Sequence, residues 1–559
     1  MLLRRVVANA LLAAKSMQFT RWHRTVQNAR ELQREKLHEK LSRIAGSRFA
    51  RDHGLSPKMN VDEFRRAIPV AGYPRMAPYI ASVMHGDVTE LFAPRTEIVM
   101  FAVTSGTTGP SKYIPVTRAQ VAEYRRSWGM WSVAIARENP SMIMGKILIL
   151  ASSWKSENAP SGVPCGSITG KLSSILFGLM RELYILHPEL ARYTPTRSRY
   201  YLYLRMALAR RDVVMINCAN PTTLIQLGRW CNEWQDDLIR DIHDGTLSRC
   251  DDLPADLRRL AGSLLTKRDP KRAKELEVVS RASAGRLLPR HAWPELARLG
   301  VWTGGTTAPF LAQLPHWYGP VPLRDHGLSA SEGRMTIPLV DGTSSGVLDV
   351  STHFFEFLPE SEIGRKNPET LLAHELEVGR DYGIVLTTSG GLVRYDMQDI
   401  VRVDGFLGEA PLLRFLNKGR DIANITGEKL TAFQVAEAAR RVQAALEIDL
   451  GEFALQPVFA DPPYYRLLME HSNLRAVRAP DVLAKAFDTE LSHSNIEYRD
   501  KQKGERLGPI RIAEVPDQYF RELRDQRIRT QGTAFEQYKH PCLITDVHMT
   551  GEDAGFASA

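Results

Sequence analysis

The stretch "TSGTTGPSK", Thr104 to Lys112, constrains the fold of this chain more than any other. It places five hydroxyl side chains, two glycines and a lysine after "EIVMFAV" (97–103), an apolar run typical of a buried strand. Hydroxyls and backbone N–H groups bind phosphate oxygens, glycine lets the backbone approach them, and lysine offsets their charge. The helix-opening nucleotide loop needs Gly-Lys-Ser/Thr in succession, and Pro110 and Ser111 interrupt that order. The stretch therefore predicts a polyphosphate-binding loop in some other fold.

The order of apolar and helical segments predicts the domain organisation. From "GKILILAS" (145–152) onward, short strands alternate with long helical segments, which indicates an α/β domain with a mainly parallel sheet. Strands joined by "SGG" and "DG" follow, and these turns favour antiparallel pairs in a second sheet. Because 559 residues are too many for one core, we expect a large domain at 1–415 and a small one at 416–559.

Composition and charge bound the class of protein. The chain is 43% hydrophobic and 25% charged, and no apolar run is long enough to span a bilayer. Its five cysteines are scattered, as expected for reduced thiols in a cytoplasmic protein. The net charge is +9, and the first fifty residues hold eleven Lys and Arg against three Asp and Glu. This excess fits either basic outer faces of solvated helices, which we favour, or an acidic partner such as a membrane surface or a carrier protein. Nothing indicates nucleic-acid binding.

The first residues, "MLLRRVVANALLAAKSMQF", combine a charged start with a short apolar stretch. A secretory signal has this form, but the apolar positions also follow helical spacing. We expect a packed N-terminal helix and no membrane association.

Three further stretches point to the same ligand. "WTGGTTAPF" (302–310) ends a strand in glycines and hydroxyl residues. "LSASEG" (328–333) places Glu332 after two serines, an acid suited to Mg²⁺, which prefers oxygen ligands and bridges phosphates. "RYDMQD" (394–399) ends a strand with Asp399, whose carboxylate can accept hydrogen bonds from two ribose hydroxyls. Each stretch alone is a weak signal, and their combination predicts a nucleotide site.

Together these stretches resemble the acyl-adenylate-forming enzymes, which include acyl-CoA ligases and peptide-synthetase adenylation domains. Within that group the chain is similar to the auxin-responsive acyl acid amido synthetase family, whose plant members conjugate jasmonate, auxin or benzoates to amino acids. The likeness covers nearly the whole chain and includes "PVAGYPRMAPYIASVMHGD", "NPTTLIQLGRWCNEWQDDLIRDIHDGTL", "LPRHAWPELARLGVWTGG", "HFFEFLP" and "EQYKHP". It implies an α/β acyl-adenylate-forming fold, in which a large N-terminal domain with several subdomains and mixed sheets carries a small, mobile α+β C-terminal lid.

The resemblance also implies an activity. A carboxylic acid would be activated with ATP and Mg²⁺ as acyl-AMP, and the acyl group would pass to an amine or amino acid. Two alternatives stay open. One is a thioester-forming ligase that loads coenzyme A or a carrier protein, and the other is a non-catalytic relative that binds nucleotide or acyl groups.

Site residues follow from the family where this sequence matches it. The triphosphate loop would comprise Thr104, Ser105, Thr107, Thr108 and Lys112. The nucleotide would be lined by Thr303, Ser329, Ala330 and Ser331, with Glu332 towards Mg²⁺.

The remaining roles belong to the expected antiparallel sheet and to the lid. Asp399 would hold the ribose, and Phe415 would pack near it at the hinge. Lys429 would reach phosphate from the lid, and Lys539 would lie between the substrate carboxylate and the α-phosphate.

This sequence departs from the family pattern at three positions. Leu328 replaces an aromatic residue that often stacks on adenine, and Gln398 replaces the glycine before the ribose aspartate. Cys542 stands where plant members usually have arginine.

Several histidines and tryptophans are further candidates for the site. His316, His326 and His353 more often serve as structural residues than as general bases. Trp128, Trp131 and Trp154 are candidates for an acyl pocket, although their helical spacing is more typical of core. We assign none of them a catalytic role.

Overall fold

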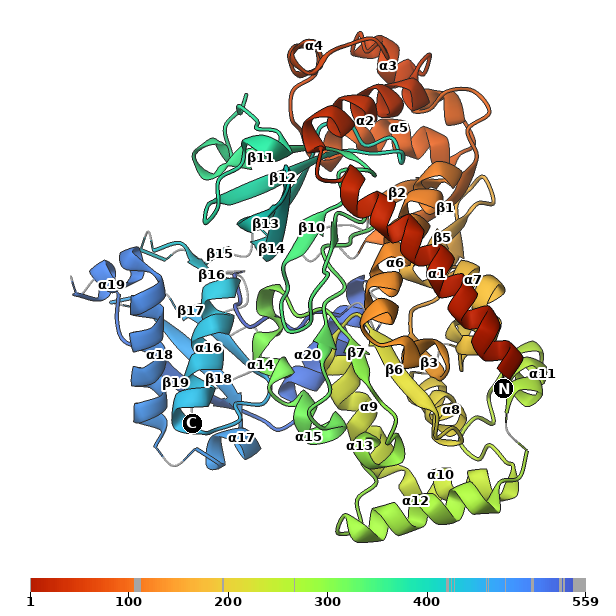
Figure 1. Cartoon of the computed structure of the whole chain (residues 1–559). Helices are drawn as coiled ribbons and strands as arrows, with labels where there is room; N and C mark the ends of the chain where they lie inside the picture. The colour runs from red at the N-terminus through yellow and green to blue at the C-terminus, as the bar shows by residue number, and fades with distance from the viewer. Residues whose placement is uncertain are drawn as a thin grey trace.

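The computed structural model describes residues 2–104, 112–193, 196–265, 267–418, 422–423, 425–426, 428–458, 460, 462–477, 479–503, 507–531, 535 and 538–545. Figure 1 shows the chain running from N-terminal helices, through three sheets, to a C-terminal α/β unit drawn in blue. The mixed α/β architecture expected from the sequence is confirmed.

The N-terminal helices form a layer against the rest of the protein. They are α1 (Leu2–Thr25), α2 (Ala29–Ile44), α3 (Arg48–Asp52), α4 (Val61–Ala67) and α5 (Tyr73–Met84). Helix α1 packs against α6 (Arg118–Glu138), and its Trp22 Nε1 donates a hydrogen bond to Asp349, 3.0 Å away. The packed helix expected at the start of the chain is therefore present. A search of the described helices found none with the length and apolar character of a membrane span.

The first sheet carries the polyphosphate-like stretch. Its strand order is β2-β1-β5-β4, formed by β1 (Ile98–Thr104), β2 (Lys112–Thr117), β4 (Glu157–Asn158) and β5 (Pro164–Gly166). The predicted strand at 97–103 is thus confirmed as β1. Strands β1 and β2 are antiparallel, and Thr104 pairs with Lys112. Helix α7 (Ile168–Met180) follows β5.

The second sheet is fully parallel, as the alternation of segments predicts. Its order is β3-β6-β7-β8, formed by β3 (Lys146–Leu150), β6 (Val213–Cys218), β7 (Arg298–Gly300) and β8 (Leu323–Arg324). Its helices are α8 (Thr196–Leu208), α9 (Pro221–Glu233), α10 (Gln235–Asp244), α11 (Ala255–Leu264), α12 (Pro270–Ala282), α13 (Pro289–Ala292), α14 (Ala308–Leu311) and α15 (Leu314–Tyr318).

The third sheet is antiparallel in every pair, again as predicted. Its order is β11-β12-β13-β14-β10-β9, formed by β9 (Thr336–Ile337), β10 (Gly346–Leu348), β11 (Phe354–Pro359), β12 (Asp381–Thr387), β13 (Tyr395–Leu407) and β14 (Ala410–Lys418). The turn between β13 and β14 lies at Gly408 and Glu409, because the expected "DG" turn is a bulged part of β13.

The C-terminal unit has a core of its own. Its strands are β15 (Ile422–Ala423), β16 (Leu430–Thr431), β17 (Phe453–Val458), β18 (Tyr464–Glu470) and β19 (Arg511–Val515). Its helices are α16 (Ala432–Leu446), α17 (His471–Arg475), α18 (Pro480–Ser494), α19 (Ile496–Lys503) and α20 (Tyr519–Gln531).

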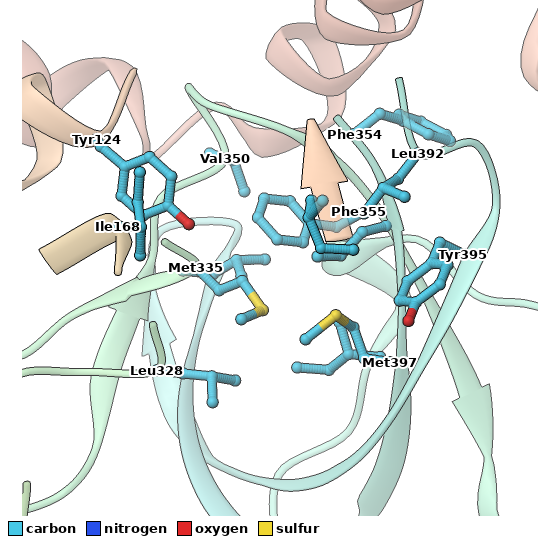
Figure 2. Close-up of a cluster of buried hydrophobic side chains, with 14 of the residues drawn as sticks. Tyr124, Ile168, Leu328, Met335, Val350, Phe354, Phe355, Leu392, Tyr395 and Met397 are labelled. Atoms are coloured by element: carbon cyan, nitrogen blue, oxygen red, sulfur yellow. The ribbon is translucent and has the colours of Figure 1, made fainter. Parts of the chain in front are cut away.

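One continuous apolar core joins the N-terminal helices to the first and third sheets. Figure 2 shows Phe354, Phe355 and Leu392 facing Met335 and Met397 inside it. Tyr395 lies at the edge of this cluster, and its hydroxyl points away from Leu392. The core thus holds fixed the strands from which the candidate site is built.

A buried ion pair ties α2 to α6 and to the turn after β12. The Nζ of Lys40 lies 2.6 Å from Glu123 Oε1 and 3.0 Å from Ser389 Oγ, and the Lys40 side chain is 0% exposed. Burial lowers the pKa of Lys40, and the charge of Glu123 opposes that shift.

We predict that Lys40→Met lowers the free energy of unfolding by about 3–5 kcal/mol, because it leaves the Glu123 carboxylate buried without its cation. Urea denaturation of the variant and parent measures this loss. Lys36→Met on the same helix is the control, because its partner Glu39 is 32% exposed and exposed pairs contribute at most about 1 kcal/mol. Equal losses in the two variants would contradict the prediction.

Candidate functional site

The candidate site lies where several chain segments end at one edge of the parallel sheet. Residues 301–305 follow β7, and Asp325 follows β8. Because the carboxyl ends of parallel strands share one edge, α/β folds bind ligands there. The other predicted site residues lie in the turn at 329–334, which the Ser329–Arg334 bridge closes, and at Asp399 in β13 of the third sheet.

Asp325 fixes the residue that follows Trp302. Its Oδ2 accepts hydrogen bonds from the backbone N (2.5 Å) and Oγ1 (2.7 Å) of Thr303, and its Oδ1 accepts from Gly327 N at 2.5 Å. Asp325 is 2% exposed. Its pKa is raised to about 6, because burial outweighs the hydrogen bonds from Thr303 and Gly327.

An ion-pair network anchors β8 just before Asp325. Arg324 is fully buried and pairs with Glu138 and Asp341, each at 2.6 Å. Arg298 of β7 reaches the same two carboxylates at 3.1 and 2.6 Å. The last turn of α6 is thereby tied to both strands that deliver the site.

Hydrogen bonds from α6 hold the turn at 329–334 in place. Ser329 and Arg334 form an antiparallel bridge, and Ala330 N donates to Gly333 O at 2.9 Å. The Tyr124 hydroxyl donates to Ala330 O, and Gln120 Nε2 donates to Glu332 O at 2.9 Å. A Cβ on Gly333 would lie 2.4 Å from His353 Nε2, so this position requires glycine.

Two tyrosines connect the triphosphate stretch, Glu332 and Asp399. Burial chiefly raises the pKa of Tyr395, and the charges of Glu332 and Asp399 raise it further. Burial also raises the pKa of Tyr73, where a hydrogen bond with Tyr113 opposes the shift and Glu332 adds to it. The Lys112 Nζ lies 5.6 Å from the centre of the Tyr73 ring. The Tyr73 and Tyr395 side chains therefore link Lys112, Glu332 and Asp399 in a series of neighbours.

The predicted lid lysine lies on the ring of Trp302. The Nζ of Lys539 is 3.8 Å from the centre of that ring, a cation–π contact. Phe415 of β14 packs edge-on against Trp302 at 5.4 Å. A Cβ on Gly305 would lie 2.9 Å from the Phe415 ring, and the φ of Gly305 is +63°, so glycine is required here. Lys539, Thr303 and Phe415 are thus neighbours.

Other contacts join the C-terminal unit to the large unit around Lys539. Asn220, at the end of β6, donates a hydrogen bond to Tyr538 O, and the His540 ring packs edge-on against Phe310 at 5.7 Å. Phe535 packs against Tyr200 and Trp230 at 5.8 and 6.0 Å.

The other predicted residues are placed as follows. Thr104 ends β1, and Ser105, Thr107 and Thr108 lie outside the described residues. Ser331 precedes Glu332 in the same turn. Lys429 is exposed directly before β16, and its φ is 46°. Its approach to phosphate stays a prediction.

The three departures from the family pattern each have a structural setting. Leu328 is buried in the apolar core, 5% exposed. Cys542 is buried in the lid core and donates to Ala432 O at 3.3 Å. Gln398 is exposed at a bulge of β13 and has a φ of 58°, a region that favours glycine.

Sequence reasoning left four residues of this region unassigned. Trp302, Tyr73 and Tyr395 stand inside the quoted stretches, and Asp325 stands seven residues before Glu332. An acid directly after a strand could have indicated Asp325. However, β8 has only two residues, which is too short for an alternating apolar pattern to reveal the strand.

Few of the described side chains near the candidate site could bind a metal ion. Within the described part of the chain no three His, Cys, Asp or Glu side chains come together as a metal cluster. Glu332 is 8% exposed, and its charge acts on Tyr395 together with that of Asp399. One carboxylate completed by phosphate oxygens and water fits Mg²⁺, which usually keeps several waters.

We predict that Gln398→Gly raises the free energy of unfolding by about 0.5–1 kcal/mol, because glycine adopts a positive φ without a steric cost. Gln398→Ala keeps the Cβ and serves as the control, since both variants retain the backbone bond from residue 398 N to Asp396 at 2.8 Å. Chemical denaturation measures both. A glycine variant no more stable than the alanine variant would refute the strain.

We predict a pH-dependent effect of Asp325→Asn. The carboxyl pKa is about 6 in the folded chain and about 3.9 unfolded. Its contribution to stability is therefore fully present below about pH 4 and is lost as the pH rises through about 6. The variant cannot titrate, so its unfolding free energy relative to the parent should rise by about 1 kcal/mol between pH 5 and 7.5. Urea denaturation at both pH values measures the difference, and a constant difference would disprove the shifted pKa.

Comparison with protein families gives three consecutive matches. The GH3 family N-terminal domain matches residues 18–323, the central domain matches 346–418 and the C-terminal domain matches 433–548.

Two relatives and one solved structure show the extent of the likeness. The indole-3-acetic acid-amido synthetase GH3.3 of Arabidopsis thaliana is 24% identical over 538 residues, covering 92% of this chain and 89% of that protein. The jasmonoyl–L-amino acid synthetase JAR4 of Nicotiana attenuata is 24% identical over 542 residues, covering 94% and 92%. The GH3.15 acyl acid amido synthetase structure superposes with a TM-score of 0.82 at 21% identity, covering 96% of this chain and 95% of that one.

These matches confirm the expected resemblance and the acyl-adenylate-forming fold. They extend over nearly the whole chain, through both the large unit and the lid. The chain belongs to the GH3 family.

Proposed function

We propose that this protein activates a carboxylic acid with ATP as an acyl-AMP and transfers the acyl group to an amine or amino acid. The observation that carries the proposal is the seat of Lys539 on Trp302, beside Thr303 and Phe415. The named relatives are amido synthetases that act on indole-3-acetic acid and on jasmonate.

The first step brings two anions together. A carboxylate oxygen of the acid attacks the α-phosphorus of ATP, the bond to the β-phosphate oxygen breaks, and pyrophosphate leaves with that electron pair. A fixed ammonium group that faces both anions lowers the barrier, because it offsets their repulsion without reorganisation. We assign that task to Lys539.

The other residues position the nucleotide. We assign the triphosphate to Lys112 and to the hydroxyls of Thr104, Ser105, Thr107 and Thr108. Asp399 would accept hydrogen bonds from the ribose, and Phe415 would pack near it.

The nucleotide would also contact Thr303, the turn at 329–334 and the lid. We assign Thr303, Ser329, Ala330 and Ser331 to its inner side, and Lys429 to a phosphate contact from the lid. Glu332 would hold Mg²⁺, which supplies positive charge to the phosphates when bound.

The second step forms the amide. The amine nitrogen attacks the acyl carbon, the carbon–oxygen bond to AMP breaks, and the amine releases a proton. Because the acyl-AMP is reactive towards water, a lid that closes for one step and moves for the next protects it. This assigns residues 1–415 to a substrate-binding domain and 416–559 to a mobile lid.

We also propose a cellular compartment for this protein. The five cysteines, Cys165, Cys218, Cys231, Cys250 and Cys542, are all buried thiols that form no disulfide among the described residues. Free thiols fit a reducing compartment, so we place the protein in the cytoplasm.

Pyrophosphate exchange into ATP tests the proposal. Exchange stimulated by one acid from a panel is expected of an enzyme, and absence of exchange with every acid would favour a non-catalytic binding protein. Mass spectrometry of products formed with amino acids, amines or coenzyme A then separates amide from thioester formation. A thioester as the sole product would overturn the amide assignment.

We predict that Lys539→Ala lowers acid-dependent exchange by about 100-fold or more, because the ammonium group acts where charge develops. Nucleotide affinity, measured by calorimetry, should change little. The control is Lys485→Ala on the exposed face of α18, which should leave exchange unchanged. Exchange that survives in the Lys539 variant would refute its role.

A further inference from the structure

Four side chains next to the turn at 329–334 form a compact group, which we call the Arg334 cluster: Trp128, Trp131, His326 and Arg334. The guanidinium carbon of Arg334 lies 3.9 Å from the centre of the Trp128 ring. The His326 ring lies edge-on to Trp128 and Trp131, at 5.4 and 5.5 Å. The sequence left these tryptophans open between core and acyl pocket, and the structure adds a buried cation to them.

The hydrogen-bond donors of Arg334 have no acceptor among the described residues. Arg334 is 1% exposed, and its Nε, Nη1 and Nη2 all lack a hydrogen-bond partner there. A guanidinium group has five N–H donors, and buried polar groups in native proteins are nearly always hydrogen-bonded. The Trp128 ring contacts the charge of Arg334 but accepts no N–H bond in its plane. A ligand or ordered water is therefore needed to satisfy Arg334.

The nearby carboxylates are already engaged elsewhere. Asp349 accepts from Trp22 Nε1 at 3.0 Å, from Ser351 Oγ at 2.6 Å and from Ser127 Oγ. Asp325 accepts from Thr303 and Gly327, as described above. Both carboxylates offset the charge of Arg334 at a distance without bonding it.

Arg334 is the single cation of the cluster near neutral pH. Burial lowers the pKa of Arg334 to about 9, against the opposing charges of Asp349 and Asp325, so it stays protonated. The pKa of His326 falls to about 3, first through burial and then through Arg334. The neutral His326 adds no second charge, so the cluster matches one carboxylate.

The cluster lies on the inner side of the candidate site. Arg334 closes the turn that carries Glu332, through its bridge to Ser329. Asp325 lies within electrostatic reach of Arg334 and binds Thr303, the neighbour of Trp302. Lys539 is exposed and contacts the ring of Trp302, whereas Arg334 is buried against Trp128. The two cations therefore have different surroundings, and each would contact a different carboxylate.

We propose that the Arg334 cluster binds the distal carboxylate of a dicarboxylic acyl acid whose other carboxylate is activated. This inference rests on the proposed function. The planar guanidinium fork pairs with a carboxylate through two parallel N–H bonds. Trp128 Nε1, also without a partner in the described part, adds a donor, and the tryptophan rings cover the apolar linker of the acid.

Matched acids test the inference in the unmodified protein. Glutarate is compared with pentanoate, and isophthalate with benzoate, because each pair shares one skeleton and differs in the distal carboxylate. In acid-dependent pyrophosphate exchange, kcat/KM should favour the better dicarboxylate by at least about tenfold, since a site built for a hydrogen-bonding group rejects an analogue that lacks it. Equal or better use of both monocarboxylates would overturn the inference.

Variants then assign the preference to Arg334. Arg334→Met should remove the preference for the dicarboxylate, and Arg334→Lys should retain part of it, because lysine keeps the charge but lacks the fork. Arg125→Met, exposed on α6, is the matched control and should keep the parental preference. A preference that persists in a folded Arg334→Met variant would mean that Arg334 is structural and bonds water only.

A binding measurement separates failure of this inference from failure of the proposed function. Thermal shift with glutarate or isophthalate, without ATP, should stabilise the parent and not Arg334→Met. If no acid supports exchange, the proposed function fails, and this measurement still decides the subsite. Equal shifts in parent and variant would overturn the subsite. A third outcome concerns the acceptor. If the acids show no difference in exchange, and Arg334 instead favours aspartate or glutamate as the acceptor in amide formation, the cluster binds the acceptor's carboxylate and the inference is overturned.

Discussion

The site depends on one cation–π contact, in which the Lys539 ammonium group lies on the face of Trp302. A reaction between a carboxylate and a triphosphate needs positive charge where the two anions meet. The chain brings this charge from its last segment, and Trp302 provides a fixed surface for it. Phe415 packs edge-on against the Trp302 ring, and Gly305 leaves room for the Phe415 ring because it has no Cβ. The large unit and the C-terminal unit thereby meet at Trp302.

The C-terminal unit keeps an apolar core of its own and meets the large unit through several contacts. Its helix α16 packs against α14 and the turn at Gly305–Thr307, Gln313 donates a hydrogen bond to Asp449 at 3.2 Å, and further contacts lie at His540, Phe535 and Asn220. An interface between two separate cores is the arrangement that the proposed lid movement requires. The residues that hold the turn of Glu332, in contrast, belong to the continuous core of the large unit. The residues that position the turn of Glu332 and the proposed lid therefore belong to different cores.

Much of this arrangement follows from the sequence, and the exceptions have physical reasons. Strand β1, the parallel sheet and the antiparallel sheet have clear apolar patterns and are present in the structure. Lys539 and Phe415, which the sequence assigned to the site, both contact Trp302. Asp325 was missed because β8 is too short to produce a pattern. Arg334 was missed because unsatisfied donors are defined by three-dimensional neighbours, which no local spacing encodes.

We propose that one adenosine polyphosphate lies between Lys112, Glu332, Asp399 and Lys539. A crystal structure with a non-hydrolysable α,β-methylene analogue of ATP is the decisive test. We expect ribose hydroxyls bonded to Asp399 and an α-phosphate within hydrogen-bond distance of Lys539. A nucleotide bound elsewhere, or one whose ribose and α-phosphate contact neither residue, would contradict it.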